Sequence, residues 1–173
     1  MDVRRAVDNE AEAEQLAAVH IEAWQWAYRG LMPDEYLRQL DSQRERRTTV
    51  WRSWLGADPA RSAVWVAAEG PTTVGFASTG PSQASDAGAS EAQLYSIYLI
   101  ENVVGKGIGH ALINAAAAEM RRQGYTACVL WVLEGNQRAR QFYEREGWAL
   151  DGGRQVDSSP GFDLIEVRYR TSL

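Results

Sequence analysis

A glycine-dense turn is the first segment of this sequence whose residues could do chemistry. It reads Gly105-Lys106-Gly107-Ile108-Gly109 and lies between a strand-like segment and an Ala-rich helical segment. Glycines let a backbone approach a ligand closely, and a helix N-terminus offers free amide donors and the positive end of the helix dipole. The turn therefore suits a pyrophosphate, although strand-to-helix turns also use glycine for geometry alone.

Two common nucleotide motifs do not fit this turn. A P-loop needs Ser or Thr after its lysine, whereas Lys106 is followed by Gly107. A dinucleotide-binding fingerprint needs a small residue where His110 stands, and it lies near the start of a chain. The sequence therefore disfavours both classes of nucleotide-binding protein.

A helix beginning at Asn136 is the second such segment. Asn136, Ala139, Arg140 and Tyr143 are spaced so that they share one helical face. Taken alone, a helix cap explains Asn136 and core packing explains Tyr143. The direct succession of glycine turn, helix, apolar strand and this helix favours a functional interpretation.

Hydrophobic periodicity and turn residues predict the elements that must position these groups. Strands are expected over 3–7, 63–68, 72–78, 93–99, 127–133, 148–154 and 162–169, and helices over 11–28, 33–40, 42–55, 110–123 and 136–146. Asp8 is expected to cap the first helix, and Pro33 to start the second. The segment 79–90 is expected to be a mobile loop.

The order of these elements predicts an α/β fold of about seven strands in a mixed sheet flanked by helices. Strand–helix–strand units in the second half predict parallel pairing there, with hairpins elsewhere. No linker or repeat divides the chain, so residues 1–173 are expected to form one domain.

Composition excludes several classes of protein. The formal net charge of −5 argues against nucleic-acid binding, which needs clustered Lys and Arg. The single cysteine, Cys128, lies inside an apolar strand, where packing explains it better than catalysis. The sequence lacks a signal-peptide pattern and any apolar run that could span a membrane, so a cytoplasmic location is expected.

Two segments of the chain resemble the signatures of the GCN5-related N-acetyltransferase superfamily. They run over 94–112 (LYSIYLIENVVGKGIGHAL) and 132–148 (VLEGNQRARQFYEREGW). The family's acyl-CoA motif, Gln/Arg-x-x-Gly-x-Gly/Ala, falls on residues 104–109 and begins at Val104. The second segment is similar to Asn-x-x-Ala-x-x-Phe-Tyr-x-x-x-Gly-Phe, with Trp148 in the last position.

The resemblance implies a fold, a reaction and roles for named residues. The sheet would be splayed at its centre, and acetyl-CoA would be the co-substrate for direct acetyl transfer to a primary amine of a small molecule or peptide. Asn136 would bond the cofactor near its amide or sulfur end, and Tyr143 would protonate the departing thiolate. The pantetheine arm would pair with the backbone of Ile97, Tyr98 and Leu99, and the pyrophosphate would meet the amides of Val104, Gly105, Lys106, Gly107, Ile108, Gly109 and His110.

Two positions depart from the family pattern. Val104 cannot make the side-chain contact of Gln or Arg, so weaker cofactor binding is expected. Gln93 stands where many relatives have glutamate, and an amide cannot act as a general base. Glu91, two residues earlier on the same strand face, is the substitute candidate, and a relay through Glu91 or His20 is equally open.

The acceptor side is the least determined part of the site. His20, Trp24, Tyr28 and Gln93 are the candidate substrate-binding residues, but core packing explains the aromatic residues of the first helices equally well. The acceptor could be a polyamine, an amino acid or peptide N-terminus, or an aminoglycoside-like antibiotic. No metal is expected, and composition predicts neither a nucleic-acid nor a membrane partner. The resemblance implies a homodimer as a family-level expectation.

A non-catalytic acyl-CoA-binding module is the competing interpretation. Val104 and Gln93 favour it, because both depart from the pattern of active relatives. The retained Asn136 and Tyr143 oppose it, because a protein that only binds the cofactor has no need for a thiolate acid.

Overall fold

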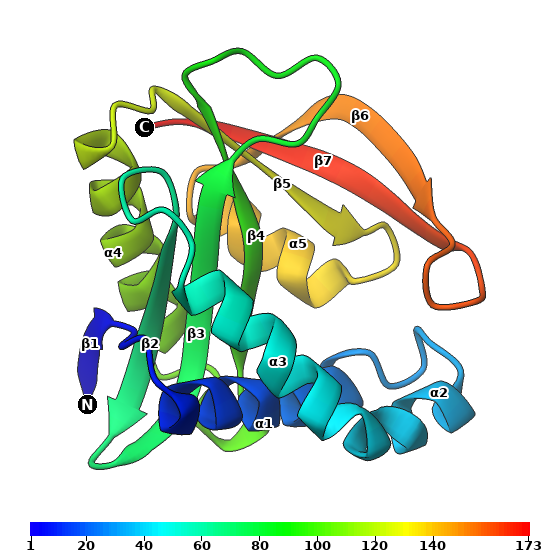
Figure 1. Cartoon of the computed structure of the whole chain (residues 1–173). Coiled ribbons are helices and arrows are strands. Elements are labelled where there is room, and N and C mark those ends of the chain that lie inside the picture. The colour runs from blue at the N-terminus through cyan, green and yellow to red at the C-terminus, as the bar shows by residue number, and fades with distance from the viewer.

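Seven strands form one mixed sheet in the computed structural model, which describes residues 1–173 (Figure 1). The strands are β1 (Asp2–Arg5), β2 (Ala63–Glu69), β3 (Thr72–Pro81), β4 (Glu91–Leu99), β5 (Ala127–Leu133), β6 (Ala149–Asp157) and β7 (Leu164–Ser172). Their order across the sheet is β1-β2-β3-β4-β5-β7-β6. The predicted mixed α/β architecture is confirmed.

The pairing of the second half was predicted only in part. Strands β4 and β5 are parallel, as expected for two strands joined through a helix. Parallel pairing of β5 with β6 is wrong, because β7 inserts between them and runs antiparallel to both. The final hairpin therefore folds back into the sheet and leaves β6 at the edge.

Five helices and two short 3-10 segments connect the strands. They are α1 (Glu10–Ala27), α2 (Asp34–Gln39), η1 (Leu40–Gln43), α3 (Arg44–Leu55), η2 (Glu101–Val103), α4 (Ile108–Arg122) and α5 (Gln137–Arg145). Asn9, and not Asp8, caps α1, because its side chain accepts a hydrogen bond from the Glu12 amide at 2.8 Å. Pro33 is the N-cap residue of α2 and not its first helical residue, so the helix begins at Asp34, one residue later than expected.

Alternation along β2 and β3 divides the core between the two faces of the sheet. Val66 and Phe76 pack against buried residues of α1 and α3. Ala67 and Ala77 point the other way and pack with α4. The helices α1 and α3 therefore cover one face and α4 covers the other (Figure 1).

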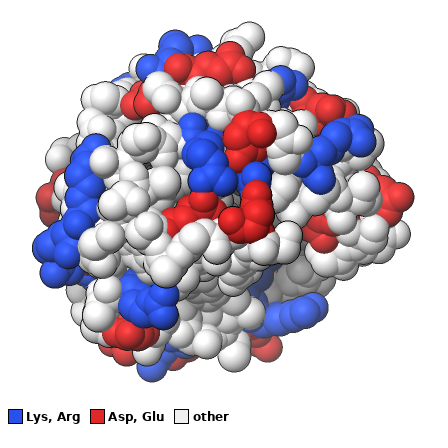
Figure 2. Space-filling model, turned by 90° about the horizontal axis from the view of Figure 1, so that it is seen from above, with Lys and Arg blue, Asp and Glu red and all other residues white.

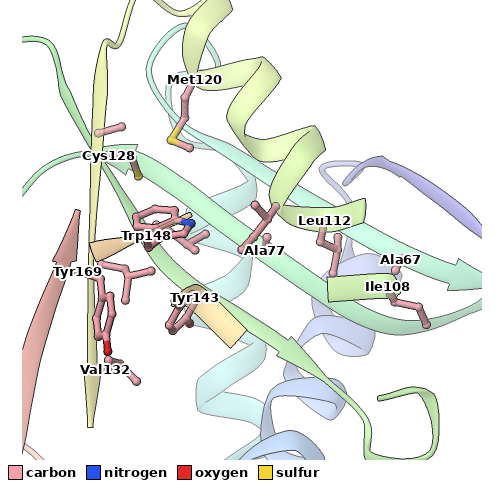
Figure 3. Close-up of a cluster of buried hydrophobic side chains, with 14 of the residues drawn as sticks. Ala67, Ala77, Ile108, Leu112, Met120, Cys128, Val132, Tyr143, Trp148 and Tyr169 are labelled. Atoms are coloured by element: carbon pink, nitrogen blue, oxygen red, sulfur yellow. The ribbon is translucent and has the colours of Figure 1, made fainter. Parts of the chain in front are cut away.

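The second half of the sheet shares the α4 side of the core. Tyr143, Trp148 and Tyr169 belong to the same buried cluster as Cys128 and Leu112, and Figure 3 shows these side chains beside β5 and α4. Cys128 is fully buried, and burial raises the pKa of its thiol to about 12. This agrees with the packing role expected for the cysteine.

Strands β4 and β5 pair over three residues only and then separate. Glu91 to Gln93 are paired with Ala127 to Val129, and no pairing follows. The register between β3 and β4 shifts between Ser78 and Thr79, which leaves Tyr95 as an extra residue in β4. Such a bulge bends the strand that carries it, and Figure 1 shows β4 and β5 diverging. The sheet is therefore splayed at its centre, as expected.

The loop after β3 is shorter than expected and is tied to the sheet. Residues 79–81 belong to β3, so the loop begins at residue 82. Within it, Asp86 pairs with Arg168 of β7 at 2.6 Å, and Arg168 also pairs with Asp151 of β6 at 2.8 Å. Seen from above, charges of both signs are intermixed over this face of the molecule (Figure 2).

Candidate active site

A cavity of about 730 Å³ lies where β4 and β5 separate. Its wall is built from the end of α1, the open half of β4, the glycine turn, β5, α5 and the β6–β7 pair. The helices α1 and α5 lie on opposite faces of the sheet, and both contribute to the wall. The cavity therefore extends through the gap from one face to the other.

The glycine turn forms one end of the cavity through its backbone. Gly105 and Gly107 have φ values of 79° and 81°, a left-handed conformation that only glycine adopts readily. Gly107 is the N-cap residue of α4, whose first turn carries no acidic residue. The side chain of Ile108 is buried in the core, and Lys106 does not line the cavity. Any anion bound here would therefore meet amides and the helix N-terminus.

Nitrogen-bearing side chains from α4 and α5 also line the cavity. Arg138 and Arg145 of α5 line the cavity, as does His110 at the start of α4. His110 is held by Glu146, whose carboxylate oxygen lies 2.8 Å from its Nδ1. Gly109 faces Phe142, and a Cβ atom added at residue 109 would lie 3.1 Å from that ring. The absence of a side chain at Gly109 lets α5 pack closely against the turn.

The open half of β4 forms the middle of the cavity wall. Ile97, Tyr98 and Leu99 all line it, and on this side they have no strand partner. The indole N–H of Trp26 donates to the carbonyl of Leu99 at 3.0 Å, and the guanidinium of Arg138 lies 4.3 Å from the centre of the Trp26 ring. These contacts hold α1, β4 and α5 together. Trp26 occupies the Leu99 carbonyl, and the rest of this edge of β4 past Gln93 has no strand partner and can pair with an extended ligand.

Asn136 and Tyr143 both reach the cavity from the α5 segment. Asn136 caps α5, since its Oδ1 accepts from the Ala139 amide at 3.1 Å, and it also lines the cavity. Tyr143 is 8% exposed and its hydroxyl bonds to no other side chain. Burial, and then the neighbouring Tyr98, raises the pKa of Tyr143. Tyr143 therefore keeps its proton and can deliver it into the cavity.

Three of the four predicted acceptor residues line the cavity. They are Trp24, Tyr28 and Gln93. The hydroxyl groups of Tyr28 and Tyr98 lie 2.9 Å apart. Burial raises the pKa of Tyr28 well above its ordinary value, and the neighbouring Tyr98, Tyr143 and Glu166 raise it further.

His20 does not line the cavity. Its ring lies in an aromatic cluster, with its centre 5.2 Å from that of Tyr98 and 5.8 Å from that of Trp51. Burial, and then the charge of Arg47, lowers the pKa of His20 to about 3. The side chain therefore packs behind the wall as a neutral ring.

Glu91 is not brought into the cavity either. It lies at the start of β4, where β4 still pairs with β5, and its carboxylate pairs with Arg170 of β7. The shared face of Glu91 and Gln93 was the reason to expect it near the acceptor. The bulge at Tyr95 lies beyond both residues, so the cavity opens past Gln93 and leaves Glu91 behind.

A group of residues on β6 and β7 that was not predicted from the sequence also lines the cavity. In the antiparallel register Gln155 faces Glu166 and Asp157 faces Leu164, and all four side chains line the cavity. Glu166 was detectable, because it is an acidic residue between Ile165 and Val167 in a strand-like segment. Asp157 fell in a predicted turn and gave no signal of its own.

No three His, Cys, Asp or Glu side chains gather in a way that could hold a metal ion. None of the helices combines the length and the hydropathy needed to cross a bilayer.

Comparison with known proteins gives consistent matches. The model of the acetyltransferase (GNAT) family matches residues 19–148. The uncharacterized N-acetyltransferase YuaI of Bacillus subtilis is 31% identical over 125 residues, which cover 72% of this chain and 68% of YuaI. A spermidine N(1)-acetyltransferase of Thermoplasma acidophilum is 24% identical over 162 residues, which cover 92% of this chain and 93% of the relative.

Solved structures share the fold. The PaiA N-acetyltransferase of Thermoplasma acidophilum, crystallised with coenzyme A, superimposes with a TM-score of 0.73 at 22% identity, over 99% of this chain and 98% of that one. An aminoglycoside 6'-acetyltransferase type Ii superimposes with a TM-score of 0.73 at 14% identity, over 99% and 97% of the two chains.

Proposed function

Because the chain belongs to the acetyltransferase (GNAT) family and is therefore an acetyl-CoA-dependent N-acetyltransferase, we propose that it acetylates a primary amine of a small molecule or peptide by direct attack. The observation that carries this proposal is the placement of Tyr143 in one cavity with the glycine turn and the unpaired edge of β4. A binding site for an acyl-CoA and a proton donor for its thiolate then lie in one cavity.

The residues of the cavity fit acetyl-CoA. The amides of residues 105–110, at the start of the 15-residue helix α4, suit the pyrophosphate, and Arg138 and Arg145 add positive charge. The unpaired edge of β4 at Ile97 to Leu99 suits the amide groups of the pantetheine arm, which can pair with a strand edge. Because the side chain of Val104 contributes no polar group, these backbone donors would carry the binding.

Direct attack requires an acid for the leaving group and no nucleophile from the protein. The Tyr143 hydroxyl is free of side-chain partners, so it can protonate the thiolate as the carbon–sulfur bond breaks. Cys128, the one thiol of the chain, is buried with a raised pKa and does not line the cavity. An acyl-cysteine intermediate is therefore not part of the proposal.

The acceptor is proposed to be an amine that enters from the side of α1, β6 and β7. This end of the cavity carries the aromatic side chains of Trp24 and Tyr28 and the carboxylates of Asp157 and Glu166. The relatives include proteins named for a polyamine and for aminoglycosides, both of which are cationic amines. The composition of this end agrees with such an acceptor.

The Tyr143→Phe variant tests the function. Purified protein is incubated with acetyl-CoA and spermidine, an aminoglycoside, or a short peptide with a free N-terminal alanine, and released thiol is measured. We expect the variant to lose on the order of a hundredfold in kcat, because it lacks the thiolate acid. Its Kd for coenzyme A should stay close to the wild-type value.

Two outcomes would contradict this role. An equal loss of coenzyme A affinity and of turnover would make Tyr143 a binding residue only. Tight coenzyme A binding by the wild type, without thiol release from any amine, would favour the non-catalytic module instead.

A further inference from the structure

Three carboxylates line the cavity, and only two of them stand at the acceptor end. They are Glu146, Asp157 and Glu166. Glu146 caps the end of α5 and is held by His110, which places it beside the glycine turn. Asp157 and Glu166 project from the β6–β7 pair at the opposite end, where Trp24 and Tyr28 also lie.

The strand register places Glu166 close to the gap. Its partner in β5 is Leu133, a buried residue that lines the cavity, and its partner in β6 is Gln155. Gln155 donates from its side-chain amide to the Glu166 carboxylate at 2.7 Å. One hydrogen bond leaves the carboxylate further lone pairs for a ligand.

Tyr28 lies near both this carboxylate and Tyr143. All three side chains line the cavity, and Tyr143 and Glu166 are among the neighbours that raise the pKa of the Tyr28 phenol. The proton donor from α5 and the carboxylate from β7 therefore line one cavity, with Tyr28 near each of them.

We propose that Glu166 is the catalytic base that takes a proton from the acceptor ammonium, directly or through one water, and that Asp157 draws cationic acceptors to it. This inference rests on the proposed function and names its missing base. Asp157 is the diagonal neighbour of Glu166 on the same face, and the Cβ atoms of such neighbours lie somewhat less than about 7–8 Å apart. Two carboxylates on this wall suit an amine that carries a further positive charge.

Glu166 takes one proton from the ammonium, and the neutral amine attacks the thioester carbon, so that a carbon–nitrogen bond forms. When the carbon–sulfur bond breaks, the electron pair leaves with sulfur, and the Tyr143 hydroxyl protonates it. The new amide nitrogen returns a proton to the Tyr143 phenolate, and Glu166 releases its proton to solvent.

The surroundings of Glu166 suit a base. Burial raises the pKa of this carboxyl, and the nearby charge of Asp157 raises it further, although Gln155 opposes the shift. The groups near Glu166 are Gln155 and Asp157 from β6, Leu133 from β5, Tyr28 at the C-cap of α1 and Tyr98 from β4. A carboxylate with a raised pKa accepts a proton from an ammonium more readily than an ordinary one.

The test compares Glu166→Gln, Asp157→Asn and Glu134→Gln, using whichever amine of the above panel the wild type acetylates fastest. We expect Glu166→Gln to lose on the order of a hundredfold in kcat and to lose the acidic limb of the pH–kcat/KM profile. We expect Asp157→Asn to raise the KM for the amine and to retain most of kcat. Glu134→Gln, a neighbouring change outside the cavity, should behave like the wild type.

Folding is checked by urea unfolding at about pH 8. A raised carboxyl pKa stabilises the folded protein at pH values below the unfolded pKa, and this stabilisation is lost as pH rises through the folded pKa. Glutamine removes that loss, so Glu166→Gln should be at least as stable as the wild type. Low activity in this variant then cannot be ascribed to unfolding.

The outcomes separate the two proposals. A Glu166→Gln variant whose kcat lies within about twofold of the wild type would overturn the role of Glu166 alone. A wild type that acetylates no amine of the panel would overturn the proposed function and this inference together.

Discussion

At the scale of single residues, burial around the cavity shifts proton affinities in opposite directions. Removal from water disfavours the charged form of any side chain. It therefore raises the pKa of the phenols Tyr28, Tyr98 and Tyr143, and it lowers the pKa of the His20 imidazole. Tyr143 consequently remains a proton donor, and His20 remains uncharged.

His20 should contribute to the loss of stability in acid. Its folded pKa of about 3 lies below its ordinary value of 6.5, so the unfolded chain takes up the proton first as pH falls. The contribution is fully present above the unfolded pKa and is lost as pH falls towards the folded pKa. Between about pH 7 and pH 4.5, the wild type should lose on the order of 2 kcal/mol more stability than His20→Gln.

Urea unfolding of both proteins at the two pH values measures this difference. Carboxylates and other titrating groups are common to both proteins, so their effects cancel in the comparison. Equal losses of stability would show that the His20 ring is accessible to water in the folded protein.

At the scale of elements, the turns before and after α4 each contain a glycine in the left-handed conformation. Gly107 and Gly124 stand at the two ends of the helix, with φ values of 81° and 89°. Neither has any atom within 4 Å of where a Cβ would lie, so alanine costs backbone strain and no collision. Only Gly107 lines the cavity.

Gly107→Ala and Gly124→Ala should therefore cost similar stability and differ in ligand binding. Each left-handed alanine is expected to lower the free energy of unfolding by about 1–2 kcal/mol. Gly107→Ala should also weaken coenzyme A binding, because it disturbs the amides that we propose to face the pyrophosphate, whereas Gly124→Ala should not. Calorimetric titration with coenzyme A checks this, and equal Kd values for the two variants would refute the assignment of the turn.

The sequence predicted the helices and strands better than it predicted which strands pair with each other. Periodicity located each helix and strand, because local spacing decides which side chains can be buried together. It could not place β7 between β5 and β6, which depends on contacts between distant segments. The bulge at Tyr95 is of the same kind, since it exists only in the register with β3. For this reason Glu91 was favoured, and Glu166 was overlooked.

At the scale of the whole molecule, the sheet consists of two half-sheets that share a short seam. Strands β1 to β4 form one and β5 to β7 the other, and three residue pairs join them. The cavity extends over both, because its lining includes Ile97 and Leu99 from one half and Trp131 and Leu133 from the other. A ligand in the cavity would therefore connect the halves.

Coenzyme A should stabilise the molecule and protect β4 in particular. At a hundredfold excess over its Kd, a ligand that binds only the folded state adds about 2.7 kcal/mol. Hydrogen–deuterium exchange should slow at residues 96–99 as well as at residues 105–110. Protection of the glycine turn alone would mean that the arm of the ligand does not pair with the strand.

The separated strands β4 and β5 also expose the ligand-free protein to aggregation. Past Gln93 and Val129, each strand has peptide groups on its inner side that no neighbouring strand satisfies. Unpaired peptide groups of this kind attract strands from other chains. During heating or long storage, extended segments of other copies could pair with these edges and start aggregation. Bound acetyl-CoA would occupy the edges and slow that aggregation.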